Sequence, residues 1–178
     1  LDQNLKFDAA SVTNLQKTPS SASNRKTWTL SFWCKPSDIG SGEQSIFTAG
    51  NACGGRLGIM FDHAMHMTLN VCGTGDVIET QAVFRDPSAW YHFVVVLDTT
   101  QSTATNRGNI YVNGEAAALT HNSSFTHNGD YSINSTDLHS IGALSNVVTN
   151  AGYCFSGYLE EMHFIDGQVL TPSSFGET

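Results

Sequence analysis

The sequence predicts an all-β fold, an antiparallel two-sheet β-sandwich of the jelly-roll kind. Short segments in which apolar and polar residues alternate follow one another along the chain, and turn residues separate them. No stretch of a dozen residues carries the apolar stripe of a helix. The 178 residues suit one domain with a sizeable core, and no internal repeat divides them, so we expect a single domain over residues 1–178.

The first strong strand signal lies at Trp28–Pro36. Alternate positions differ in polarity, which predicts a half-buried strand ended by the proline. Cys34 falls on the core side, where it is expected to be a small buried hydrophobe, and Trp33 falls on the opposite side. Further strands are expected at 46–48, 56–61 and 65–71, the last two forming a hairpin through Asp62-His63-Ala64.

The most apolar run is Trp90–Asp98, and its continuous character predicts a central strand buried on both faces. The next strand, 109–112, precedes Asn113-Gly114, the pair of φ > 0 residues that a type I′ hairpin turn requires. A long polar loop is expected at 121–136, the last strands at 138–144 and 153–165, and one turn in the tail that places the Phe175 ring on the body.

Charge excludes two classes of partner. The chain carries 16 acidic residues against 8 Lys and Arg, a formal charge of -8. Binding to nucleic acid or to anionic lipid depends on basic residues, so neither is expected. No apolar run is long enough to cross a bilayer, so membrane insertion is not expected either. The first residues show no signal peptide and no initiator Met, so we expect a processed or trimmed chain.

The four cysteines form no C-x-x-C pair, so a structural zinc site is not indicated. If 56–61 and 65–71 pair as a hairpin, Cys53 and Cys72 lie almost opposite each other at its open end. They are the pair expected to form a disulfide, provided that the compartment is oxidising.

Four blocks of the chain, in order, resemble laminin G-like domains of the concanavalin A-like superfamily. They are Trp28–Pro36, Trp90–Asp98, Ile110–Gly114 and Phe155–Phe164. The ending, His163–Glu177, resembles such domains in structural proteins of tailed bacteriophages, particularly marine ones, where they lie on fibres or capsid surfaces. The resemblance implies a concanavalin A-like sandwich, a fold that serves lectins, adhesion modules, virion surface proteins and some glycoside hydrolases.

Enzymatic activity is not expected, and no catalytic residue is assigned. Retaining hydrolases of this fold carry acids at alternate positions as Glu-x-Asp-x-x-Glu. Here Glu160 and Glu161 are adjacent and would point to opposite faces of a regular strand, while Asp166 lies beyond the strand end. His63 and His66, three residues apart around a turn, are interpreted as solvated turn histidines.

Calcium is the one cofactor that the resemblance implies, because many domains of this family hold Ca²⁺ in loops at the sandwich rim. Hard cations need several oxygen ligands, and the candidates at predicted strand ends and loops are Asp62, Asp98, Asn106 and Asp137, with Asp76 beside them. The alternative, which we favour, is ordinary turn chemistry, in which Asp and Asn bond to nearby backbone groups.

Glycan binding needs an exposed aromatic face with clustered polar groups. Trp33 points away from the inferred core, and Tyr131 and Tyr158 are further candidates. The alternative for each ring is burial under a loop or a neighbouring subunit. A shallow ligand site is expected at the rim formed by Asn51, Asp76, Asn146, Asn150 and Tyr153.

The function expected from these observations is a non-enzymatic virion structural or surface-displayed domain, as capsid decoration or tail fibre, with attachment to host cell-surface glycans. Its partners would be other virion proteins or copies of itself, and its location the virion surface. The alternative is a secreted or cell-surface carbohydrate-binding or adhesion module, and a glycoside hydrolase ranks below both.

Overall fold

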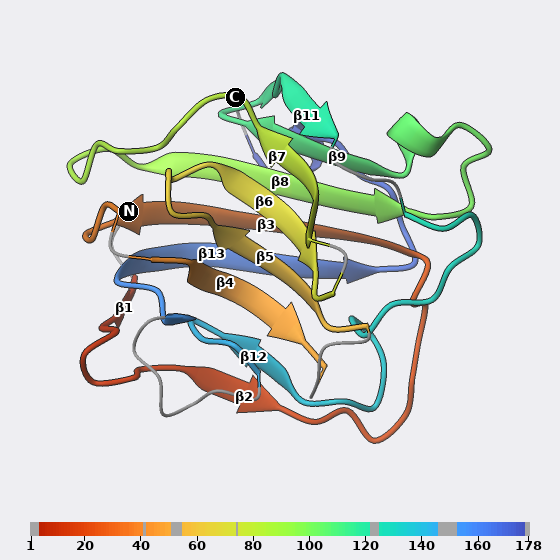
Figure 1. Ribbon diagram of the computed structural model, residues 1–178, viewed down its shortest axis with the longest axis horizontal. Coiled ribbons are helices and arrows are strands. Elements are labelled where there is room, and N and C mark those ends of the chain that lie inside the picture. The colour runs from red at the N-terminus through yellow and green to blue at the C-terminus, as the bar shows by residue number, and fades with distance from the viewer. Residues whose placement is uncertain are drawn as a thin grey trace.

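Two antiparallel β-sheets face each other in the computed structural model, which describes residues 4–40, 42–50, 55–73, 75–121, 125–145 and 153–176 (Figure 1). The six-stranded sheet has the order β1-β13-β3-β8-β9-β10, and the seven-stranded sheet the order β11-β7-β6-β5-β4-β12-β2. The predicted all-β sandwich is confirmed.

The six-stranded sheet contains β1 (Leu5–Phe7), β13 (Gly157–Asp166), β3 (Thr27–Pro36), β8 (Tyr91–Asp98), β9 (Gly108–Val112) and β10 (Glu115–Ala116). The seven-stranded sheet contains β11 (Leu119–His121), β7 (Gly75–Thr80), β6 (Met67–Val71), β5 (Leu57–Phe61), β4 (Gln44–Ala49), β12 (His139–Ile141) and β2 (Leu15–Lys17). The described residues also contain the short 3₁₀ helices η1 (Ala104–Asn106) and η3 (Pro172–Ser174). None of the helices in the described part of the chain has the length and apolar character needed to span a membrane.

The strand predictions with the strongest patterns are confirmed. β8 lies between β3 and β9 and is buried from His92 to Asp98, as expected of a central strand. Asn113 and Gly114 have φ of 49° and 86° and connect β9 to β10 with Val112 opposite Glu115, as expected for a two-residue hairpin turn. β5 and β6 form the predicted hairpin, in which Leu57 pairs with Val71.

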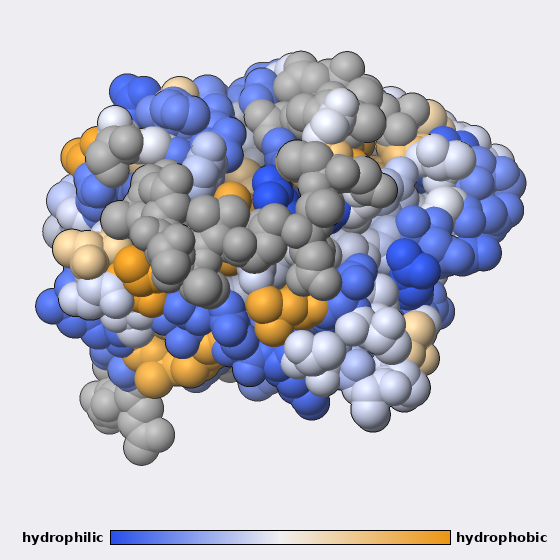
Figure 2. Space-filling view, turned by 60° about the horizontal axis from the view of Figure 1, so that its bottom comes forward, coloured by the Kyte–Doolittle hydropathy of each residue, from blue (hydrophilic) through white to orange (hydrophobic). Residues whose placement is uncertain are grey.

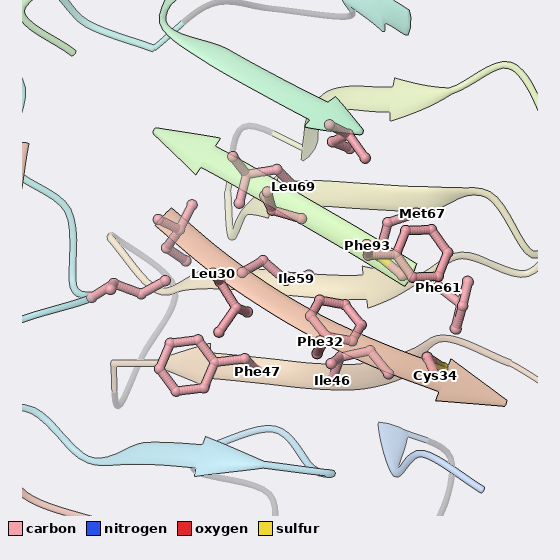
Figure 3. Packing of buried hydrophobic residues seen from close by; sticks show 14 of the residues in the cluster. Leu30, Phe32, Cys34, Ile46, Phe47, Ile59, Phe61, Met67, Leu69 and Phe93 are labelled. Atoms are coloured by element: carbon pink, nitrogen blue, oxygen red, sulfur yellow. The ribbon is translucent and has the colours of Figure 1, made fainter. Parts of the chain in front are cut away.

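The core lies between the two sheets (Figure 3). From β3, Leu30, Phe32 and Cys34 point into this layer, and Phe32 stacks on Phe93 of β8 with ring centroids 5.5 Å apart. Phe61 of β5 meets Phe93 edge-on from the opposite sheet at 5.9 Å. Each such fully buried aromatic side chain contributes roughly 1.5–3 kcal/mol to folding. The two sheets are therefore held together by an aromatic cluster at their centre.

β3 departs from the prediction in one respect: from Trp28 to Phe32 it is buried on both faces, whereas Trp33 and Lys35 further along remain partly buried. Thr29 and Ser31, on the face away from the core, are 0% and 1% exposed. The C-terminal segment crosses this face, because the Thr29 hydroxyl donates to the Gln168 carbonyl at 2.8 Å and accepts from the Leu170 N–H at 3.0 Å. The tail ends with Phe175 stacked against His163 at 6.2 Å, which confirms the predicted contact of this ring with the body.

β13 is not the regular strand that the sequence analysis assumed. Its pairing with β3 shifts register between Glu160 and His163, and Glu161 there has φ of 48°. This is a β-bulge, which re-aims side chains locally. Glu160 becomes buried, at 8% exposure, while Glu161 remains exposed. Simple alternation of the two glutamates across a flat strand therefore does not describe this position.

Candidate functional site

Aromatic rings gather around a lysine on the outer face of the six-stranded sheet. Lys35 of β3 pairs with Tyr158 of β13, and its Nζ lies 5.0 Å from the centroid of the Tyr158 ring and 5.5 Å from that of Trp90. The Trp90 and Tyr158 rings are 6.5 Å apart. We call Trp33, Lys35, Trp90 and Tyr158 the aromatic platform, because all four side chains are only partly buried. Three of them lie on the central strands β3 and β13, and Trp90 directly precedes β8.

Trp33 extends the aromatic platform along β3. It stacks on His92 of β8, with ring centroids 4.9 Å apart and planes 22° from parallel. The Nε2 of His92 shares a hydrogen bond of 2.8 Å with the Ser31 hydroxyl. Burial lowers the pKa of His92 below its usual value, against the opposing charge of Glu161. The ring beside Trp33 is therefore neutral at neutral pH and held in one orientation.

This arrangement is suited to a sugar ring. The C–H face of a pyranose packs on aromatic faces, and a few polar groups at fixed positions supply orientation. Lys35 offers N–H donors in the middle of the rings, where a sugar hydroxyl or carboxylate would reach them. Sites carried on rigid strands hold their geometry better than sites on loops. The arrangement can therefore hold a sugar by ring stacking and hydrogen bonding.

The alternation in the sequence placed Trp33 away from the core, and the structure confirms this. It also brings Tyr158 to the same face, whereas Tyr131 packs edge-on against the buried Phe125 at 5.1 Å. Trp90 and Lys35 were missed. Lys35 lies two residues from Trp33 on the same face of one strand, and this spacing is the signal by which the sequence indicates it.

The loop site expected from the sequence lies mostly outside the described residues. Asn51, Asn146 and Asn150 fall outside them, as does the side chain of Asp76. Tyr153 is half-buried. Its neighbour Cys154 pairs with Ser45 of β4 through an isolated parallel β-bridge of the backbone. Earlier in the chain, the Thr48 hydroxyl of β4 donates to the Ala143 carbonyl at 3.0 Å. The loop site therefore stays a prediction.

One group in the described part of the chain combines three metal-ligating side chains. Asp62, His66 and Glu79 place one ligand atom each within 4.8 Å of one another. They lie by the β5–β6 turn and on β7, where Glu79 pairs with Thr68. A mixed nitrogen and oxygen set suits Zn²⁺ or Mn²⁺ better than Ca²⁺, which prefers oxygen alone. Among the predicted calcium ligands, only Asp62 belongs to this group.

Asp62 and His66 are bonded to each other, so His66 is not the solvated turn histidine that the sequence suggested. Its Nδ1 lies 2.9 Å from the Asp62 Oδ2, and both side chains are about three-quarters buried, at 25% and 23% exposure. Burial alone raises the pKa of Asp62, but the bonds from the His66 ring and from the His66 and Ala64 N–H groups outweigh it and lower the pKa below 3.8.

The other predicted calcium ligands take part in local turns. Asp98 accepts bonds from the Thr100 hydroxyl at 2.6 Å and from the Gln101 amide at 2.6 Å. Asp137 accepts from the Ser135 hydroxyl at 2.9 Å. Asn106 is the last residue of η1. These contacts are the turn chemistry that the sequence analysis favoured as the alternative.

The cysteines divide into two kinds. Cys72 is disulfide-bonded, whereas Cys53, its predicted partner, lies outside the described residues. The N–H of Cys72 donates to the Arg56 carbonyl at 2.9 Å, at the open end of the hairpin as expected. Cys34 and Cys154 are buried thiols, and burial raises the pKa of both. The pairing of Cys53 with Cys72 remains a prediction.

The architecture is that of a lectin-type β-sandwich. A family model described as the concanavalin A-like lectin/glucanases superfamily, of laminin G type, matches residues 9–174, so the chain belongs to this superfamily. No curated protein matches the sequence significantly.

Solved structures share the fold. The SAP-like pentraxin of Limulus polyphemus matches with a TM-score of 0.62 and 17% identity, covering 91% of this chain and 71% of that one. The CBM40 of the Ruminococcus gnavus IT-sialidase matches with a TM-score of 0.59 and 16% identity, covering 93% of this chain and 97% of that one. That module has been solved bound to α2,3 and α2,6 sialyllactose. Trypanosoma rangeli sialidase matches with 0.53 and 17%, covering 85% of this chain and 22% of that one. At such identities the likeness shows a shared fold alone.

Proposed function

We propose that this protein is a non-catalytic glycan-binding module that holds sugars on the aromatic platform. The carrying observation is that the Trp90 and Tyr158 rings flank the Lys35 ammonium, with Trp33 two residues away along β3 on the same sheet face. A solved carbohydrate-binding module that shares the fold over nearly its whole length supports this proposal. In this role a sugar ring packs on the indole and phenol faces while Lys35 bonds to a hydroxyl or carboxylate.

We further propose that the module is displayed on a virion as capsid decoration or part of a tail fibre. The resemblance of His163–Glu177 to domains of tailed-phage structural proteins supports this location. Weak affinity at one site is sufficient there, because many copies on one particle multiply it through effective concentration. Detection of the protein in purified particles is the direct test. A secreted or cell-surface adhesion module is the alternative, and its absence from particles would favour it.

Binding of the tetramerised domain to a broad glycan array, with calcium and with chelator, tests the proposed glycan binding. We expect binding that survives chelation and falls about fivefold to thirtyfold in Trp90→Ala and Tyr158→Ala, because each loses an aromatic contact of roughly 1–2 kcal/mol. Tyr153→Ala is the matched control, since it removes a half-buried aromatic ring that is not part of the aromatic platform.

The outcomes separate the candidate sites. Loss of binding in Tyr153→Ala but not in Tyr158→Ala would move the glycan site to the loops of the seven-stranded sheet. Binding abolished by chelation would assign it to a metal-dependent site instead. Absence of binding to any glycan would contradict the proposed function.

A further inference from the structure

Three side chains that can hold a metal ion meet on the outer face of the seven-stranded sheet, by the turn between β5 and β6. Asp62 and His66 face each other across this turn, where the Asp62 N–H donates to the His66 carbonyl at 3.1 Å. Glu79 of β7 pairs with Thr68, which lies two residues beyond His66 and between two core residues of β6. The register of β5, β6 and β7, neighbours in Figure 1, therefore brings one ligand atom of each side chain within 4.8 Å of the others.

The Asp62 carboxylate is held in a direction that suits a shared ion. Its Oδ1 accepts from the Ala64 and His66 N–H groups at 2.9 and 2.8 Å, and its Oδ2 faces the His66 Nδ1 at 2.9 Å. Ligand atoms in a tetrahedral zinc site lie roughly 3.3 Å apart, because the metal–ligand bonds are about 2.0–2.1 Å long. A small opening of the pair therefore admits a cation between Oδ2 and Nδ1. The ring hydrogen then lies on Nε2, since a neutral imidazole can carry it on either nitrogen.

Glu79 supplies the third ligand atom and is able to move toward the ion. Its side chain is half-buried, and its carboxylate makes no hydrogen bond or ion pair with another described residue. Asp62 and Glu79 together bring two negative charges to a partly buried place, and a divalent cation balances both. Three protein ligands leave a fourth position for water, as in zinc sites that are open to solvent.

We propose that Asp62, His66 and Glu79 bind a divalent transition-metal ion such as Zn²⁺. The imidazole nitrogen favours Zn²⁺ over Ca²⁺ and Mg²⁺, which take oxygen ligands. Hydrophilic side chains surround separate hydrophobic patches on the side shown in Figure 2, and the chain has a formal charge of -8, which raises the local concentration of cations. The site lies on the face opposite the aromatic platform and does not depend on the proposed glycan function.

Titration of the metal-free full chain with Zn²⁺, followed by calorimetry and by NMR of the histidine ring nitrogens, tests the proposal. We expect one ion per chain and a displacement of the His66 ring signals, with no comparable response to Ca²⁺. Glu79→Gln should weaken Zn²⁺ binding at least about tenfold, because the loss of even an outer-shell partner of a metal costs that much. Glu115→Gln, at an exposed position of β10, makes the same change in net charge and should leave binding unchanged.

The histidine has a matched control in the same turn. His66→Gln should weaken Zn²⁺ binding at least about tenfold, whereas His63→Gln, at an exposed position, should not. The Tm of the unsubstituted chain should rise on addition of Zn²⁺, and that of Glu79→Gln and His66→Gln should rise less, because an ion that binds the folded chain stabilises it. Equal affinity for Zn²⁺ and Ca²⁺, unchanged binding in Glu79→Gln, or unmoved His66 ring signals in excess Zn²⁺ would overturn the proposal.

Discussion

His139 shows how a single buried side chain fixes its own protonation state. Its Nδ1 lies 2.9 Å from the Asp137 carbonyl, which only accepts, and its Nε2 lies 3.0 Å from the Asn134 N–H, which only donates. Only the neutral tautomer with hydrogen on Nδ1 satisfies both bonds. Burial lowers the pKa of His139 below 6.5, although the bond to the Asp137 carbonyl opposes this.

This geometry predicts a loss of stability on mild acidification. Because the pKa of this histidine is lower in the folded state, the unfolded chain binds a proton at a higher pH than the folded chain does. The free energy of unfolding therefore falls as pH drops below about 6.5. Thermal unfolding at pH 8, 7, 6 and 5 measures this. His139→Gln should have a lower Tm at pH 8 but a shallower decline, because it removes one of the two described histidines whose pKa folding lowers and leaves His92. Parallel profiles for the two proteins would contradict the assignment.

The bulge in β13 shows how one element sets the surfaces on both sides of it. It lies between Tyr158 of the aromatic platform and His163 under the tail, and it sets Glu161 and Met162 together opposite the one residue between Trp33 and Ser31 of β3. Its defining residue, Glu161, has φ of 48°, a conformation that Asn tolerates and β-branched residues avoid.

The effect of a substitution at Glu161 on stability should depend on the backbone preference of the new residue more than on the loss of charge. Glu161→Val should lower the free energy of unfolding by about 1–2 kcal/mol, whereas Glu161→Asn, with the same loss of charge, should change it by less than about 0.5 kcal/mol. Urea denaturation of the three proteins compares them directly. Equal losses for Val and Asn would mean that the carboxylate, and not the backbone, matters at this position.

Elements with a long periodic pattern were predictable, and short ones were not. β8 and the Asn113-Gly114 turn follow from local sequence. β1 and β2 contain three residues each, too few for a period-2 signal, and they form because a neighbouring strand pairs with them. The candidate site divides in the same way. Trp33 was found from alternation, but Trp90 joins it only through the register of β3 with β8.

The C-terminal tail completes the molecule as a whole. It caps the outer face of the six-stranded sheet through the bonds to Thr29, the buried Pro172 and the Phe175 ring. Truncation after Asp166 should therefore lower Tm by several degrees, roughly 2–4 °C per kcal/mol lost, and increase the binding of a hydrophobic dye. The double substitution Val169→Ala and Ser173→Ala, at exposed tail positions, is the control that should leave both unchanged. An unaltered Tm after truncation would show that the tail adds nothing to stability.

The aromatic platform and the Asp62–His66–Glu79 group lie on opposite outer faces of the sandwich. Packed sheets are about 10 Å apart, and side chains on both faces add to that distance. Electrostatic potential decays over about 8 Å at physiological ionic strength, so a divalent ion on one face is largely screened from a sugar on the other. If the proposed glycan site and this group are both occupied, we expect cation occupancy and glycan affinity to be independent of each other, with a coupling free energy close to zero.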